Sequence, residues 1–366
     1  MLDFMEADRA RLSDLDIRIM EVESSLSALR AKRALVQHRL DAYKYPILTV
    51  PNEITSEIFM HFLPDYPAVS PLNGLASPTS LTHVCHKWRE VALATPALWR
   101  AIRFNNHHIP YEEILPICRT WIKRSGSCAL SIDINLDNSD ILHKIFAEPL
   151  AMATMRWEHL NLWVPPQPPW AQPSFPNIGS MPMLRSLNLT SPMGPDVSTF
   201  SQVPQLRTVV LGNSGVISKI TLPWIQLTSL TLKYVSVAQC TRILVETLNL
   251  VQCTLYLDSA DGLGVFTDLA LPCLESLALQ DDSWEQTVGE RFLNRFTVPS
   301  LRRLELEEVF LGAEPITALE LFISKSRCRL QEVCISEDTA KHHELYRQAF
   351  PSIPVFSFTS KRRLGF

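Results

Sequence analysis

Apolar side chains recur along the first forty residues at alternating intervals of three and four. Eight of the nine positions on this stripe are apolar and one is an arginine: Leu12, Leu15, Ile19, Val22, Leu26, Leu29, Arg33, Val36 and Leu40. This heptad pattern predicts a coiled-coil-like helix over residues 1–44. Arg11 and Arg18 stand five residues before Asp16 and Glu23, the spacing that pairs opposite charges between parallel helices.

The stripe leaves two interpretations open. Residues 12–40 can form a homodimer, or the long helix can pack back onto its own chain. Four heptads that include Arg33 make a weak dimer when they act alone.

The prolines and apolar positions of the next segment, residues 45–104, predict three short helices. Pro51 suits the first position of a helix, and Pro64 ends that helix. A loop follows, and Ser77-Pro78 begins a second helix, which Thr95-Pro96 closes. The expected apolar face of this second helix includes Leu81, Val84, Cys85, Trp88, Val91 and Ala92. Ala97-Leu98-Trp99 then forms a short third element.

A pattern of three apolar positions, φ-x-x-φ-x-φ, recurs eight times between residues 157 and 336. Its first positions lie 21–29 residues apart, at Trp157, Leu184, Leu206, Leu227, Leu250, Leu274, Leu301 and Leu330. That period is typical of leucine-rich repeats, which stack parallel strands into a solenoid. In the fifth repeat Val245/Leu248/Leu250 also fits, but the frame that starts at Leu250 gives more even spacing.

The segments between the repeats and on either side of them indicate the fold class, which is α plus α/β solenoid. Helical return segments are expected at about 237–247 and 315–326. Residues 105–156 form a connector and N-terminal cap, with an alternating strand at 128–134, and residues 337–366 form a C-terminal cap and tail.

Alternate positions of each repeat strand face away from the core, on the concave surface of the predicted solenoid. Most of these side chains are small and polar. A few larger or charged ones could anchor a protein target, namely Trp163, Lys233, Tyr256, Arg303 and Glu305. The alternative is that this face is simply solvated.

Composition narrows the class of protein. The chain has 366 residues, of which 46% are hydrophobic and 20% charged, so global disorder is excluded. A net charge of −4 argues against a nucleic-acid partner. There is no apolar run of 18 residues, so no membrane span is expected, and residues 1–11 lack the core of a signal peptide. The eight cysteines are therefore expected to be reduced thiols in the cytoplasm or nucleus.

Candidate chemistry is sparse. The nucleotide-binding, serine-hydrolase and zinc-protease motifs do not occur. His83, Cys85 and His86 lie together, but Cys85 is expected to point into an apolar helix face and no second ligand pair has suitable spacing. We expect no cofactor, no metal and no catalytic residue, and hence no enzyme.

Residues 46–104 resemble an F-box, and in particular the F-box-like proteins of mushroom-forming fungi. The resemblance is carried by Leu48-x-x-Pro51-x-Glu53-Ile54, Ile58-Phe59, Leu81-x-x-Val84-Cys85-x-x-Trp88-Arg89 and Pro96-x-Leu98-Trp99. It implies docking to a Skp-type adaptor on a cullin scaffold. The residues implied in that docking are Leu48, Pro51, Ile54, Ile58, Phe59, Leu63, Leu81, Val84 and Trp88. The insert between the first two helices, residues 64–78, is longer than in a typical F-box.

Together these patterns favour a substrate receptor of a cullin–RING ubiquitin ligase, with an unidentified protein target bound by the repeats. The alternative is a leucine-rich scaffold, assembled through the N-terminal helix and independent of ubiquitin. A simpler interpretation of the apolar face of residues 46–104 is that it packs on the C-terminal domain.

Overall fold

The structure is a computed structural model that describes residues 2–43, 46–105, 110–136, 138–163, 179–190, 200, 202–259, 268–282, 292–337 and 343–360. Contacts divide the chain into two compact units, Met1–Glu57 and Ile58–Phe366. Each unit is described by itself.

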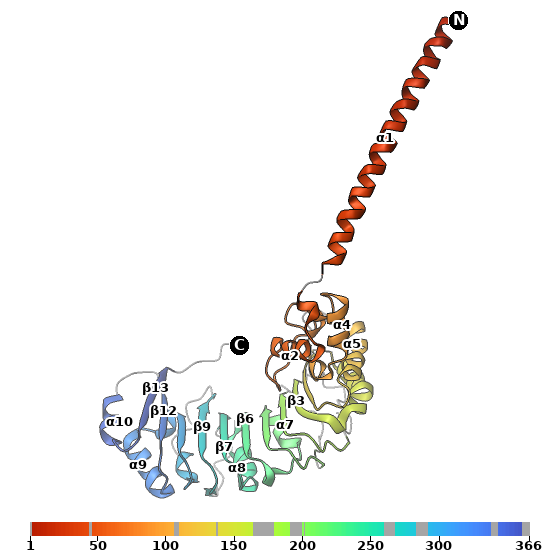
Figure 1. Ribbon diagram of the computed structural model, residues 1–366. Helices are drawn as coiled ribbons and strands as arrows, with labels where there is room; N and C mark the ends of the chain where they lie inside the picture. The colour runs from red at the N-terminus through yellow and green to blue at the C-terminus, as the bar shows by residue number, and fades with distance from the viewer. Residues whose placement is uncertain are drawn as a thin grey trace. The chain divides into compact units, whose positions relative to one another are not determined.

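The first unit is dominated by one long helix, α1 (Leu2–Ala42) (Figure 1). Its length follows from the sequence, because no proline or glycine occurs before Pro46 and the heptad pattern runs through it. The predicted N-terminal helix is thus confirmed. A short 3₁₀ turn, η1 (Pro46–Thr49), precedes α2 (Asn52–Phe62), in which the unit ends.

The second unit is built on a sheet of eleven parallel strands, in which neighbours in space follow the order of the chain. The strands are β1 (Ala101–Asn105), β2 (Leu130–Asn135), β3 (Trp157–Trp163), β4 (Ser186–Thr190), β5 (Thr208–Gly212), β6 (Ser229–Ser236), β7 (Gln252–Ser259), β9 (Ser276–Asp281), β11 (Arg303–Glu307), β12 (Glu332–Glu337) and β13 (Val355–Ser360). A separate parallel pair joins β8 (Leu269–Ala270) to β10 (Phe296–Thr297).

The eight predicted repeat strands are all present, as β3 to β7, β9, β11 and β12. Their second and third apolar positions are buried and in register, so each makes a continuous row through the core. One row runs through Leu160, Leu187, Val209, Leu230, Cys253, Leu277, Leu304 and Val333. In the fifth repeat the frame that starts at Leu250 is confirmed, because Val245 lies in a helix.

The sheet extends beyond those repeats at both ends. The predicted strand at 128–134 is β2, but the sheet begins one strand earlier, at β1, which the sequence analysis missed. At the other end β13 pairs with β12, so the C-terminal segment adds a strand as well as a helix.

Helices return the chain between strands and lie along the outer side of the curved sheet (Figure 1). The two predicted return helices are confirmed as α8 (Val237–Glu246) and α9 (Pro315–Ser326). The other helices and turns of this unit are α3 (Pro78–Leu81), α4 (His86–Leu93), η2 (Pro96–Trp99), α5 (Tyr111–Arg124), α6 (Ser139–Ile145), the π-helical turn η3 (Phe146–Leu150), η4 (Ala151–Arg156), α7 (Ser214–Lys219), η5 (Trp224–Gln226), η6 (Leu293–Arg295), η7 (Glu308–Leu311) and α10 (His343–Ala349). This parallel sheet with its helices is compatible with an α/β solenoid-like fold.

Candidate protein-interaction surfaces

The small helices that precede β1 are part of the same core as the sheet. Trp99 of η2 is fully buried, and its Nε1 donates to the carbonyl oxygen of Ala92 at 2.9 Å. Its ring meets Trp121 of α5 edge to face at 5.2 Å. Phe59 is also buried and meets Trp88 edge to face at 4.9 Å. These aromatic contacts hold the end of α2, α4 and η2 firmly against the rest of the second unit.

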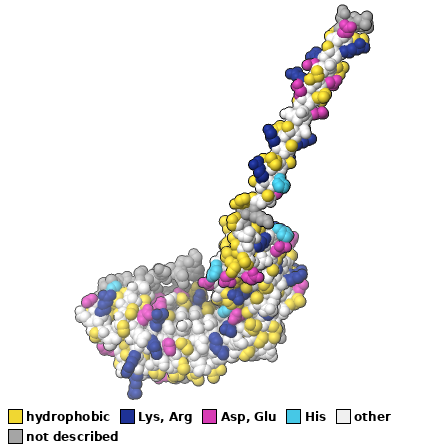
Figure 2. All heavy atoms as spheres, viewed as in Figure 1, with side chains coloured by type: hydrophobic (Ala, Val, Ile, Leu, Met, Phe, Trp, Pro, Cys, Tyr) yellow, Lys and Arg dark blue, Asp and Glu magenta, His cyan; other side chains and the backbone are white. Residues whose placement is uncertain are grey.

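The side of α2 next to Phe59 is apolar and uncovered. Ile54, Ile58 and Phe62 recur every four residues, so they share one side of the helix, and they are 54%, 49% and 42% exposed. We call this set the α2 face. Figure 2 shows hydrophobic side chains gathered over the part of the molecule where α2 lies in Figure 1. Such a concentration of exposed apolar side chains on one short helix is typical of a docking surface.

The nine residues that the F-box resemblance implies fall into three groups. Pro51, Ile54, Ile58 and Val84 are exposed, and Leu48, Leu63 and Trp88 are partly exposed. Phe59 and Leu81 are buried, so they support the surface from behind and do not lie on it. Phe62 belongs to the α2 face but was not among the nine. Its position four residues after Ile58 was the signal that could have identified it.

The second predicted helix is interrupted, which corrects the expected role of Cys85. The chain leaves the helical path after α3 and begins α4 only at His86. Cys85 is the N-cap of α4, and its Sγ accepts from the backbone N–H of Trp88 at 3.4 Å. Arg89 donates from Nε to the carbonyl oxygen of Thr82 at 2.8 Å, and so satisfies an acceptor at the break. Val84 is consequently 60% exposed and does not lie on a buried face.

The long insert, residues 64–78, packs on the first strands of the sheet. Ser70 forms a parallel bridge with Ile102 of β1, and Ser131 of β2 donates from Oγ to the carbonyl oxygen of Pro67 at 2.6 Å. The Tyr66 hydroxyl donates to Oε2 of Glu158 on β3 at 2.8 Å. The insert therefore ties the small helices to three consecutive strands, while Ile58 and Phe62 remain exposed.

Charged groups surround Tyr66 on both sides. The Arg100 guanidinium lies over its ring, 4.0 Å from the centroid, and Arg185 pairs with Glu158 at 3.1 Å. Burial and the bond to Glu158 raise the pKa of the Tyr66 hydroxyl, so it remains a donor. His159 meets the Tyr66 ring edge to face at 5.5 Å, and burial lowers the pKa of its imidazole, with Glu158 opposing and Arg185 assisting the shift.

A small cavity of about 170 Å³ lies beside this contact, lined by residues that include Met60, Tyr66 and Arg100. It is too small for a drug-sized ligand. We assign no function to it.

We call the face of the sheet that points away from the core and the return helices the outward face. Four of the five predicted anchors lie on it, on strands β6 to β11. The Lys233 ammonium lies 5.8 Å from the centroid of the Tyr256 ring. Burial raises the pKa of the Tyr256 hydroxyl, and the negative charges of Asp282 and Glu305 add to that shift. Arg303 is not a free cation, because its Nη2 lies 2.6 Å from Oε2 of Glu332. Trp163 lies apart, on β3, three strands from Lys233 in the sheet order.

Small uncharged side chains fill the middle of this face. In the central row Asn188, Val210, Thr231, Thr254 and Ala278 stand in register on adjacent strands. Lys233 adds a cation on the middle strand, β6, and two charge pairs lie nearer the ends, where Arg103 donates to Asp133 at 2.9 Å and Arg303 pairs with Glu332. The surface is thus polar, and its central row on these strands is uncharged.

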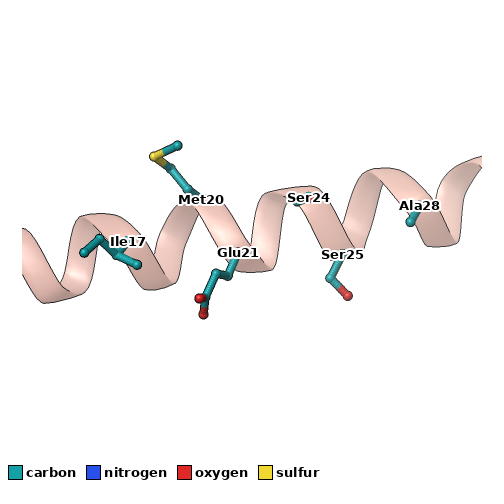
Figure 3. Close-up of a pocket in the computed structure, with 6 residues that line it drawn as sticks. All are labelled: Ile17, Met20, Glu21, Ser24, Ser25 and Ala28. Atoms are coloured by element: carbon teal, nitrogen blue, oxygen red, sulfur yellow. The ribbon is translucent and has the colours of Figure 1, made fainter.

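Ligand-binding chemistry is not evident in the described residues. No group of three or more histidine, cysteine, aspartate or glutamate side chains within them is placed to hold a metal ion. Cys240 and Cys253 are buried, and burial raises the pKa of both thiols. A depression on α1, lined by Ile17, Met20, Glu21, Ser24, Ser25 and Ala28, is formed by a single helix and encloses nothing (Figure 3). Among the helices in the described ranges, none is both long and apolar enough to cross a bilayer.

The chain was compared with protein-family models and with curated proteins. No protein-family model matches the chain, and no curated protein matches it. The F-box resemblance therefore depends on residues 46–104 themselves.

Proposed function

We propose that this chain is a non-catalytic substrate receptor, which binds a Skp-type adaptor through residues 46–104 and a target protein through the outward face of the sheet. The observation that carries the proposal is the α2 face. Its apolar side chains are exposed on a helix that is anchored in the core by the neighbouring side chain of Phe59.

The energetics of burial favour a partner for this face. Covering a half-exposed isoleucine or phenylalanine contributes about 1 kcal/mol, from about 25 cal/mol per Å² of apolar surface. Three such side chains on one helix suit an apolar groove between helices of a partner. The order of motifs in residues 46–104 supports a Skp-type adaptor as that partner.

The chain would act by positioning. A target held by the sheet and an adaptor held by the α2 face share one molecule, so the target would have a high effective concentration near the ligase that modifies it. The residues we assign to the target are Trp163, Lys233, Tyr256, Arg303 and Glu305.

The test is co-purification of the full chain with a Skp-type adaptor. Ile58→Asp combined with Val84→Asp places two carboxylates on exposed positions, and should weaken retention by about tenfold or more. Leu75→Asp is the matched control, since Leu75 is 91% exposed on the insert and lies outside the α2 face. Trp88 is not used, because it packs against Phe59 and its loss would disturb the core.

The outcomes separate two functions. Retention by the wild type and by Leu75→Asp, with loss in the double variant, supports the receptor. Failure of the wild type to retain the adaptor, or unchanged retention by the double variant, refutes it. That result would leave the ubiquitin-independent scaffold as the better proposal, since the polar sheet face needs no adaptor.

A further inference from the structure

The seam of α1 is an uncovered apolar stripe of eight residues. They are 44–66% exposed: Leu12, Leu15, Ile19, Val22, Leu26, Leu29, Val36 and Leu40. A helix in water gains most of its stability from packing an apolar face, and little from its own hydrogen bonds. A 41-residue helix with such a stripe therefore calls for a partner that repeats the same spacing.

The charges beside the seam select both the partner and its direction. On one flank the charged residues are all basic, Arg11, Arg18, Lys32 and Arg39, and on the other flank Asp16 and Glu23 are acidic and Arg30 is basic. A parallel second copy in register sets Arg11 against Asp16 and Arg18 against Glu23, twice each by symmetry. The seam is self-complementary in this arrangement.

An antiparallel copy that buries the same seam brings together residues of the same flank. It would set Arg11 of one helix against Arg39 of the other, and Arg18 against Lys32. Each of these like-charge contacts occurs twice, so they outnumber the two favourable contacts between Asp16 and Arg30 on the other flank and destabilise association.

Arg33 limits the strength of the parallel pair. It occupies a seam position, so two copies of this side chain would meet at one layer. The long aliphatic stem lets each guanidinium reach water, at a cost in affinity. Arg30 and Lys32 stand close by and add like charge.

We propose that α1 is the interface of a parallel, in-register homodimer of this chain, of moderate affinity because of Arg33. The proposal is independent of adaptor binding, since it uses no residue of the α2 face.

The first experiment measures the mass of the full chain by sedimentation at micromolar concentrations. The wild type should have twice the mass of one chain. Leu26→Asp should raise the dissociation constant by about tenfold or more, and Arg33→Leu should lower it by a similar factor. Ile17→Asp is the matched control, because Ile17 is 56% exposed on the face shown in Figure 3, outside the seam. Circular dichroism checks that each variant keeps its helix.

The second experiment determines the direction of the pair. Leu12→Cys in the full chain should cross-link to itself under mild oxidation, because a parallel pair sets residue 12 against its own copy. Ser13→Cys, one position off the seam, should cross-link far less.

The proposal fails if the wild type is monomeric, or if Leu26→Asp or Arg33→Leu behaves like Ile17→Asp. Cross-linking of Leu12→Cys with Val36→Cys, in place of Leu12→Cys with itself, would show an antiparallel pair and overturn the proposed direction. Ile58→Asp with Val84→Asp should remain dimeric, so loss of adaptor binding cannot be mistaken for loss of the dimer.

Discussion

At the scale of single residues, burial decides which side chains can react. Three cysteines are buried in the core: Cys118 on α5, Cys240 on α8 and Cys253 on β7. Desolvation disfavours a thiolate, so the pKa of Cys118 and that of Cys240 rise to about 12. Cys273, in contrast, is exposed. The spacing of the cysteines along the sequence does not predict these differences, because the burial of each thiol depends on the elements that pack around it.

Thiol labelling checks this contrast. At pH 8 a disulfide reagent should modify the exposed Cys273 in the folded chain. It should leave Cys118, Cys240 and Cys253 unmodified, because these thiols are buried and remain protonated. All eight cysteines should react after denaturation. Rapid modification of Cys240 in the folded chain, located by peptide mass spectrometry, would contradict the burial.

His159 makes folding stability depend on pH. Burial lowers the pKa of its imidazole in the folded chain, so the unfolded chain takes up the proton first as pH falls below about 6.5. The unfolded state then binds more protons, and stability decreases with falling pH until the folded imidazole also protonates. Between pH 7.5 and 5.5 the wild type should therefore lose more free energy of unfolding than His159→Gln.

Denaturant titrations of the two chains at both pH values give this difference. His83→Gln is the control for replacing a histidine at an exposed position. Equal pH dependence in the wild type and His159→Gln would contradict the effect assigned to burial.

At the scale of elements, the insert adds side-chain contacts to the buried aromatic residues that join the small helices to the sheet. Its anchors are side-chain contacts with strands far along the chain, such as Tyr66 with Glu158. The prolines of the insert predict a loop at residues 64–78, but no repeating pattern in the sequence predicts which strands that loop contacts. The interrupted second helix has the same cause: its apolar spacing predicts one helix, and the bond from Arg89 to Thr82 stabilises the break.

Removing one hydroxyl tests the importance of the insert. Tyr66→Phe deletes the donor to Glu158, and should lower the free energy of unfolding by about 1–2 kcal/mol. Limited proteolysis within residues 64–78 should also become faster, since the insert would detach more often. Tyr234→Phe, at a 42% exposed position, should change neither measurement. Unchanged proteolysis in Tyr66→Phe would show that the insert is held by its other contacts.

Strands were the most predictable elements. A period of two with leucine at fixed positions marks each inner strand locally, and the same residues provide the core, so the eight repeat strands could be predicted. β1 (Ala101–Asn105) was missed although it has the same burial pattern as β4, because its residues lie at the end of the segment that was assigned to three short helices. The exposed side of α2 could be predicted only in part, because periodicity does not tell which apolar face the rest of the fold covers.

At the scale of the whole molecule, the chain separates into a helical N-terminal unit and a unit built on the sheet. The core of the second unit is continuous, from Phe59 through the small helices to the last strands. Its stability should therefore not depend on α1.

Deleting residues 1–43 tests that separation. A loss of about 1 kcal/mol in the free energy of unfolding would lower the thermal midpoint by about 2–4 °C in a domain of this size. The midpoint of the remaining chain should change by less than that. Near-ultraviolet circular dichroism reports the buried tryptophans such as Trp99 and Trp157 and should be unchanged. A large drop in the midpoint would mean that α1 contributes directly to the sheet unit.

The unbroken parallel register of the sheet has an evolutionary consequence. Each inner strand pairs only with the two strands that flank it, so one strand with its return segment can be duplicated or lost while the remaining pairs keep their register. Outward side chains on such units contribute little to the core and can change without disturbing it. Descendants of one ancestral chain could thus differ in strand number and in the side chains that the outward face presents.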